Sequence, residues 1–232
     1  MAKAKRKAIP PSYYYDGRKK CWKTENFVLP DAPTTDTIRK WIQAWEETDG
    51  YPEQESALDK LFGDLCPDNE ELDDILIKVC TLNDFYSTNI YKVFDVAKVI
   101  QSLDIDSRLN AGAPDTHIVD DIVDGVKQRT GRSVYSFASK YCSHHKPELY
   151  PIYDSYVDML LRYYRDKEEA EDFSFSDEEL QNYASFCRIE MDFKRHFGLQ
   201  EFNAKEIDKF LWQVGKQSFP KWRDLEESDE EE

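Results

Sequence analysis

Apolar residues recur at intervals of three and four along most of this chain, and this spacing constrains the fold more than any other feature. One such stripe ends at Gly50 and consists of Ile38, Trp41, Ile42 and Trp45. Residues at these intervals share one face of an α-helix, whereas a half-buried strand requires strict alternation. Because the sequence contains no convincing alternating segment, the periodicity predicts an all-α protein.

Helix caps and breakers divide the chain into short helical segments. The predicted helices cover approximately residues 36–50, 52–65, 68–82, 87–100, 115–131, 133–144, 155–164, 177–197 and 204–214. Short helices joined by brief loops favour a globular multi-helix array over a long four-helix bundle. We expect this array to be one domain, at residues 34–222.

Both ends of the sequence differ from this helical body. Residues 1–33 are rich in Pro, Tyr, Lys and Arg and predict an extended basic and aromatic arm that packs on the body at Trp22 and Phe27. Residues 223–232 predict an acidic disordered tail, since seven of the last nine residues are acids. No apolar segment reaches the length of a membrane span or a signal peptide, so the expected location is the cytoplasm, away from membranes. The expected oligomeric state is a monomer.

Neither a metal nor another cofactor is predicted. The five cysteines are scattered and lack CxxC spacing, which argues against a disulfide framework and against a zinc cluster. His144 and His145 have only Glu148 close behind them, too few ligands for a metal site. We expect both histidines to be exposed loop residues.

The charge of the chain is uneven. A formal net charge of −16 repels nucleic acid, so DNA binding requires a local patch of opposite sign. Residues 1–24 form one such patch, which we interpret as a solvated arm. Residues 125–147 form a second patch without a single Asp or Glu, and its cations are Lys127, Arg129, Arg132, Lys140 and Lys146. This second patch predicts a surface that meets a negatively charged partner.

Residues 131–161, GRSVYSFASKYCSHHKPELYPIYDSYVDMLL, contain a helix, a loop ending at Pro151, and Asp154 at the start of another helix. This order resembles the helix-hairpin-helix (HhH-GPD) DNA glycosylase superfamily, in which a segment like V-P-V-D-T-H-V carries the catalytic Asp. The interval of sixteen residues from Ala138 to Asp154 is similar to that of the 8-oxoguanine glycosylase branch. The resemblance implies a glycosylase fold, duplex DNA with a modified base as partner, and Asp154 as the catalytic carboxylate.

The resemblance extends upstream to residues 82–100, LNDFYSTNIYKVFDVAKVI, which look like the family's early helix pair. In the family, the loop of this pair presents polar residues to the DNA strands, and here Asn83 and Ser87 stand in it. They have an alternative interpretation as turn and cap residues.

The DNA-binding hairpin departs from the family pattern G-x-G-x-x-[TK]-A. Only Gly131 is present, so phosphate binding would depend on nearby side chains and on the amides after Gly131. The predicted phosphate contacts are Lys127, Arg129, Arg132 and Ser133.

The catalytic lysine of bifunctional family members is also missing, because Ser136 occupies its position two residues before Ala138. Lys140 lies one helical turn further on, where it either reaches the sugar or faces solvent. Without the family lysine, we expect monofunctional hydrolysis: Asp154 positions a water and stabilises the positive charge that grows on the deoxyribose. In the alternative interpretation, Asp154 only caps the helix that begins at Ser155.

A base that is to be excised must swing into a pocket where aromatic side chains stack on it. The residues predicted to line this pocket are Phe85, Tyr86, Tyr135, Tyr150 and Tyr153. Any one of these tyrosines has an alternative place in the core, with its hydroxyl hydrogen-bonded.

Three functions therefore stay open at this point. The first is a DNA N-glycosylase-like hydrolase, acting on an atypical substrate such as a modified base in foreign DNA. The second is a catalytically inactive glycosylase-fold module that binds DNA or a protein. The third is an acidic helical interaction protein that uses its negative surface.

Overall fold

A computed structural model of the chain describes residues 11–19, 21–111 and 114–220, and within these ranges the protein is mostly helical. Ten α-helices follow one another in the described ranges: α1 (Thr35–Glu47), α2 (Tyr51–Lys60), α3 (Leu72–Phe85), α4 (Val93–Ser102), α5 (Ile105–Leu109), α6 (His117–Thr130), α7 (Tyr135–His145), α8 (Ser155–Glu168), α9 (Tyr183–His196) and α10 (Ala204–Ser218). The predicted all-α class is confirmed.

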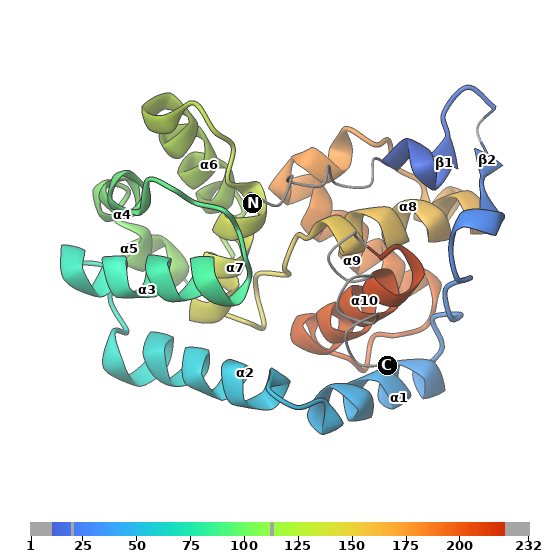
Figure 1. The fold of residues 1–232 in the computed structure, drawn as a ribbon, viewed down its shortest axis with the longest axis horizontal. Helices are drawn as coiled ribbons and strands as arrows, with labels where there is room; N and C mark the ends of the chain where they lie inside the picture. Colours follow the sequence, from blue (N-terminus) through green and yellow to red (C-terminus); the bar gives the residue numbers. More distant parts are fainter. Residues whose placement is uncertain (1–10, 20, 112–113, 221–232) are drawn as a thin grey trace, which may run out of the picture.

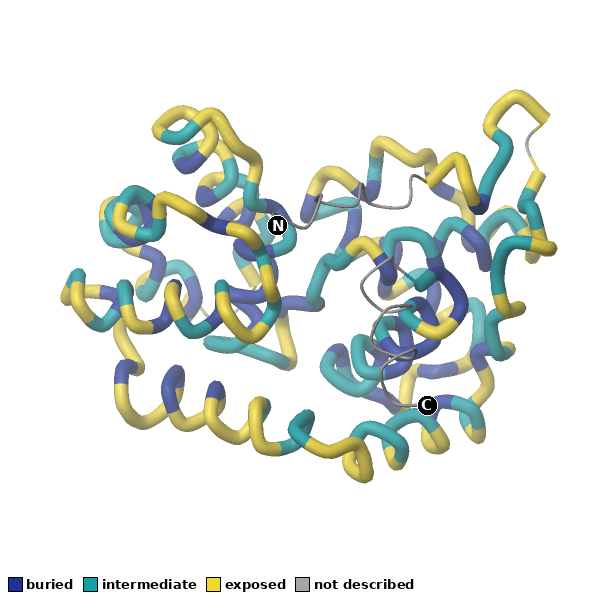
Figure 2. Tube along the Cα trace, viewed as in Figure 1, coloured by how far each residue is buried: buried dark blue, intermediate teal, exposed yellow. Residues whose placement is uncertain are grey.

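The helices form two groups that lie side by side (Figure 1). In one group α3 packs on α4 and α7, and α6 packs on α4 and α7. In the other, α10 packs on α1 and α8. Helices α1 and α2 run along one edge of both groups. The two groups are also joined where α6 contacts α9. Buried residues line the inner faces of each group, as Figure 2 shows.

The contact between α8 and α10 depends on a glycine. A Cβ added at Gly215 on α10 would lie 2.8 Å from both the Cβ and the carbonyl oxygen of Tyr156 on α8. Since a backbone atom cannot move aside as a flexible side chain can, only glycine allows this approach. The first turn of α8 and the last turns of α10 are thereby held together.

Replacing Gly215 by Ala is expected to lower the free energy of unfolding by about 2 kcal/mol, because the added methyl group pushes α10 away from α8. Urea denaturation measures this loss. The matched control is Gly63→Ala, since a Cβ at Gly63 meets no atom within 4 Å. Equal stability changes in the two variants would contradict the proposed close packing.

Residues 11–33 pack onto the body, with Trp22 and Phe27 in contact with it as predicted. The ring centroids of Trp22 and Tyr163 are 5.4 Å apart, and those of Phe27 and Phe219 are 5.0 Å apart. This segment is not simply extended, because it contains 3₁₀ turns and a short antiparallel hairpin. The two strands of the hairpin, β1 (Tyr15–Asp16) and β2 (Cys21–Trp22), have two residues each. The sequence pattern was too short to predict this hairpin.

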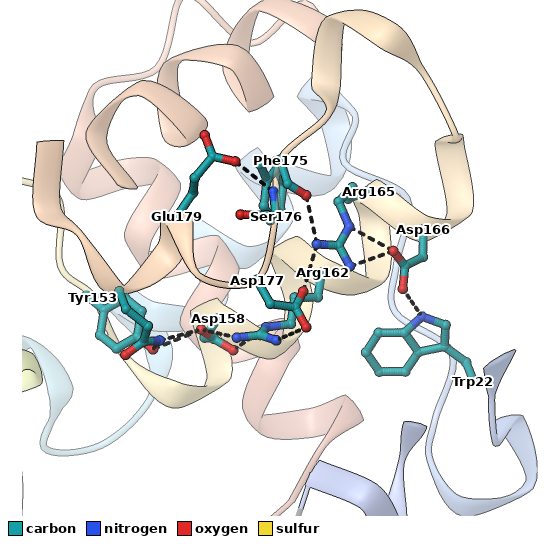
Figure 3. A network of polar contacts seen from close by, with 11 residues as sticks. Trp22, Tyr153, Asp158, Arg162, Arg165, Asp166, Phe175, Ser176, Asp177 and Glu179 are labelled. Atoms are coloured by element: carbon teal, nitrogen blue, oxygen red, sulfur yellow. Dashed lines mark hydrogen bonds and ion pairs between the residues drawn. The ribbon is translucent and has the colours of Figure 1, made fainter. Parts of the chain in front are cut away.

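An ionic network on α8 fixes this segment and the stretch before α9 (Figure 3). The Trp22 indole N–H donates to Asp166 at 3.0 Å, and Asp166 pairs with Arg165 at 2.7 Å. Arg165 also donates to Asp177 at 2.8 Å, and Arg162 binds the other oxygen of the same carboxylate. The network therefore connects three segments that are far apart in the sequence.

Several predicted boundaries are wrong. The helix expected from residue 87 begins at Val93, and the helix expected from residue 177 begins at Tyr183 after a 3₁₀ turn at Glu179–Gln181. Helix α5 was not predicted, because its single turn is too short for a periodic signal. The predicted acidic tail at 223–232 and the first ten residues of the basic arm lie outside the described residues.

Candidate active site

Asp154 stands where the extended segment after α7 enters α8. Ser139 on α7 fixes this segment, since its hydroxyl accepts the Tyr153 N–H at 3.1 Å and donates to the Tyr153 carbonyl at 3.3 Å. The Tyr183 hydroxyl donates to the Pro151 carbonyl at 2.8 Å. Asp154 then caps α8, because its Oδ1 accepts the Tyr156 N–H at 2.9 Å. The capping interpretation is thus correct, but it uses one carboxylate oxygen only.

The other oxygen of Asp154 faces Lys140. Their Nζ–Oδ2 distance is 3.3 Å, and the exposed fractions of the two side chains are 3% for Lys140 and 15% for Asp154. The prediction that Lys140 faces solvent is therefore wrong. Its ammonium also donates to the Ser136 hydroxyl at 2.7 Å. The ammonium of Lys140 thus lies between the Ser136 hydroxyl and Asp154.

Asp154 and Lys140 both line a pocket of about 340 Å³ between the two helix groups. This volume lies within the range of small-molecule sites. Six helices contribute walls: α1 and α2 through Trp45 and Tyr51, α3 through Phe85, α7 through Lys140, α8 through Tyr156, and α10 through Trp212. Tyr86 and Ser87, which directly follow α3, complete one side.

Aromatic rings form two sides of this pocket. The ring centroids of Trp45, Tyr51 and Trp212 lie 4.8 to 5.9 Å from one another. Phe85 and Tyr86 also line the pocket, and Lys140 Nζ lies 5.1 Å from the centre of the Tyr86 ring. Flat apolar walls of this kind suit a planar aromatic ligand.

Two titratable groups in the pocket are held neutral. Burial raises the pKa of Asp208 to about 8, with Lys140 opposing and Asp154 adding to the shift. Asp208 has no hydrogen-bond or ion-pair partner among the residues described. Burial, Lys205 and Lys140 lower the pKa of His144 to about 3, and its Nε2 lies 2.9 Å from the Tyr86 hydroxyl. His144 is a half-buried residue in the last turn of α7, so the expectation of an exposed loop histidine is wrong.

The pocket also contains paired charges. Glu55 on α2 accepts Lys205 at 2.6 Å and Lys209 at 3.0 Å, and these lysines hold the pKa of Glu55 below its usual range against the effect of burial. Glu55 also accepts the Trp45 indole N–H at 2.9 Å. This cluster fixes the Trp45 ring and ties α2 to α10.

Three of the predicted base-pocket tyrosines lie elsewhere, which is a correction. Tyr135 and Tyr153 pack against one another with ring centroids 4.4 Å apart and planes tilted by 41°, and the Tyr153 hydroxyl donates to Asp158 at 2.8 Å. Tyr150 is fully buried and its hydroxyl accepts the Asp115 N–H at 3.1 Å. These three rings pack in the core instead of lining the pocket.

The predicted phosphate-binding residues come together around the end of α6. Gly131 has φ +76° and ends the helix in the left-handed conformation that favours glycine. Lys127, Arg132 and Ser133 are exposed there. Arg129 is less free than predicted, since it pairs with Asp95 at 3.5 Å.

The loop after α3 separates the two predicted strand-contacting residues. Ser87 lines the pocket, but Asn83 is occupied by its own loop. The Asn83 carboxamide accepts the Ile90 N–H at 2.8 Å and the Thr88 hydroxyl at 2.9 Å, and it donates to the Ile90 carbonyl at 3.1 Å. Asn83 therefore lies in α3, and its side chain holds the loop that follows this helix.

Sequence reasoning missed four pocket residues: Trp45, Tyr51, Asp208 and Trp212. Trp45 was assigned to a buried helical stripe, and the others carried no signal because their helices are far from Asp154 in the sequence. Asp208 and Trp212 are separated by about one helical turn, so both side chains lie on one face of α10. That spacing is the one local clue.

Comparisons with known proteins give a relative and a family model. A family model described as the HI_0787_N N-terminal domain matches residues 37–149. An uncharacterized protein of Haemophilus influenzae is 39% identical over 156 residues, which cover 66% of this chain and 72% of that protein. No solved structure matches significantly. The matched domain includes Lys140 and ends before Asp154.

The described helices were also compared with the requirements of a bilayer span. None of those within residues 11–19, 21–111 and 114–220 is both long enough and apolar enough to cross a membrane. Within the same ranges, no three His, Cys, Asp or Glu side chains are grouped to hold a metal ion.

Proposed function

The chain belongs to the same family as the uncharacterized protein of Haemophilus influenzae that is 39% identical to it, and we propose that it is a DNA N-glycosylase-like hydrolase with Asp154 as its catalytic carboxylate. The proposal includes the helix-hairpin-helix glycosylase architecture, with α6 and α7 as the hairpin and α8 as the helix that carries the catalytic residue. Its partner is DNA, and its substrate is a base turned out of the strand.

One observation carries this proposal: Asp154, whose Oδ1 caps α8 and whose Oδ2 pairs with Lys140, lines a pocket with aromatic walls. A helix cap needs no such pocket, whereas base excision needs both a carboxylate and stacking surfaces. A base between the Trp45 and Tyr86 sides would have its glycosidic bond within reach of Asp154. The acid-free hairpin at 131–133 lies at the N-terminal end of α7, the helix that carries Lys140.

In this mechanism, Asp154 acts mainly through its charge. As the bond between base and sugar breaks, positive charge grows on the deoxyribose, and a fixed carboxylate in a water-poor pocket stabilises it. Asp154 also orients the water that attacks the sugar carbon. The Tyr156 N–H and the Lys140 ammonium hold the carboxylate in place, so little reorganisation is needed during the reaction.

Lys140 has a positioning role in this proposal. Its ammonium is already shared between Asp154 and the Ser136 hydroxyl, which disfavours attack on the sugar as a free amine. We therefore keep hydrolysis without strand cleavage as the reaction. Sodium borohydride, added during turnover, distinguishes the two routes, because it traps a covalent protein–DNA adduct only if the lysine amine attacks the sugar.

The test is release of free base. The protein is incubated with oligonucleotides that carry different modified bases, and the released base is identified by mass. We expect release of at least one base together with an abasic site. A protein that binds these DNAs but releases nothing from any of them would support the inactive binding module instead.

Asp208 gives a second test, through pH. With its pKa near 8, the Asp208 carboxyl is protonated at neutral pH and can donate a hydrogen bond to an acceptor atom of the base. Because the protonated form is lost as the pH rises through 8, we expect kcat/KM for base release to fall about tenfold per pH unit above 8. Asp208→Asn keeps a donor that does not ionise, and its profile should stay flat in this range. A wild-type profile that is level from pH 7 to 9.5 would contradict this role.

A further inference from the structure

Two large aromatic side chains stand out from the surface at the start of α4. The exposed fractions are 68% for Tyr91 and 54% for Phe94, so most of each ring surface is open to solvent. Exposed apolar side chains that lie together mark interaction sites, whereas single ones do not, and these two rings are only three residues apart. Neither residue belongs to the pocket around Asp154.

Cations lie over both rings. The Arg132 guanidinium carbon lies 5.1 Å from the centre of the Tyr91 ring, and Lys98 Nζ lies 5.7 Å from the centre of the Phe94 ring. Arg132 comes from the hairpin between α6 and α7, so two segments far apart in the sequence meet here. The carboxylate next to Phe94 in the sequence, Asp95, is paired with Arg129 at 3.5 Å. The chain is strongly acidic as a whole, so this surface differs from it in sign.

The loop between α3 and α4 fixes the position of these rings relative to the pocket. Ser87 lines the pocket and lies four residues before Tyr91, so their Cα atoms are at most about 14 Å apart. Ser87 and Asn89 have φ values of +48° and +58°, a conformation that non-glycine residues adopt only where the surroundings impose it. Together with the bonds of Asn83, this backbone holds Tyr91 close to the pocket mouth.

From this arrangement we infer that Tyr91 and Phe94 form a stacking platform for unpaired nucleotides beside the target base. Base faces are free to stack on protein rings only where they are not stacked within a duplex, and the cations supply the contacts to phosphate. A protein partner would need no alternation of rings with cations. The inference deepens the proposed function: the substrate class is DNA with a single-stranded stretch, such as a loop, a fork or a displaced strand.

Fluorescence anisotropy with labelled oligothymidylate tests this platform in the intact protein. We expect the Tyr91→Ala, Phe94→Ala double variant to bind the single strand at least about tenfold more weakly than wild type, since stacking contributes about 1–3 kcal/mol per base. Tyr91→Phe should retain the affinity, because the ring remains. Met191→Ala, which removes a side chain that is 63% exposed on α9, is the matched control and should bind as wild type does.

Two results would overturn the platform: equal affinity of the double variant and wild type for the single strand, or a preference of wild type for a blunt duplex of the same length. The assay measures binding and involves no release of base. Strand binding that depends on Tyr91 and Phe94 therefore supports the platform even if the glycosylase proposal fails. Base release without such binding would support the glycosylase proposal and overturn the platform.

Discussion

Replacing Asp154 by Asn is expected to lower the rate of base release by about 10³-fold, within the range that an acid–base residue contributes to catalysis. Asparagine is as good a helix cap as aspartate, so the first turn of α8 should keep its bond to the Tyr156 N–H. What is lost is the negative charge that faces the sugar. Single-turnover kinetics with a saturating excess of protein measure this step without the contribution of substrate binding.

The control for Asp154→Asn is Asp124→Asn, which removes an exposed carboxylate on α6 outside the pocket. This variant should release base at the wild-type rate. DNA affinity should be unchanged in both variants, and Asp154→Asn alone should lose stability, because it leaves the buried Lys140 ammonium without its carboxylate partner. If Asp154→Asn released base as fast as wild type, Asp154 would be a helix cap and nothing more.

Replacing Glu190 by Gln is expected to stabilise the protein at pH 8 by about 3 kcal/mol. The Glu190 side chain is buried on α9, one of its oxygens has no hydrogen-bond partner, and burial raises its pKa to about 7, with Lys194 opposing. The folded protein thus keeps a proton that the unfolded chain loses near pH 4.5. Stability therefore falls as the pH rises from about 4.5 to 7, and the penalty is fully present above 7.

Urea denaturation at pH 4.5 and pH 8 measures this effect. Glutamine carries no charge at either pH, so the gain should be large at pH 8 and close to zero at pH 4.5. Glu178→Gln, at an exposed position, should change stability little at either pH. An equal effect of Glu190→Gln at both pH values would show that ionisation of Glu190 is not the cause.

Helical periodicity predicted most of the fold because most helices here have one buried face. It failed where contacts distant in the sequence determine the backbone. The helix expected from Ser87 begins six residues later, because the Asn83 side chain ties down the intervening loop. The hairpin near Trp22 likewise depends on its contact with Asp166 and on the surface of α8.

The candidate site was predictable only in its local part. Asp154 and Lys140 could be connected from the sequence, since a helix and one short loop separate them. The pocket walls could not be predicted from the sequence, because Trp45 and Trp212 come from opposite ends of the domain. Tyr135 was placed wrongly for a geometric reason: it lies five residues before Lys140, about 140° away around α7, so the two side chains point to different faces.

The most direct measurement compares the affinity of the protein for two oligonucleotides that differ at one nucleotide. One carries a pyrrolidine abasic analogue, whose cationic ring resembles the charged sugar of the transition state, and the other carries the neutral tetrahydrofuran analogue. We predict that wild type binds the pyrrolidine DNA at least about 100-fold more tightly and that Asp154→Asn loses this preference. Equal Kd values of wild type for the two DNAs would contradict a catalytic role for the Asp154 carboxylate.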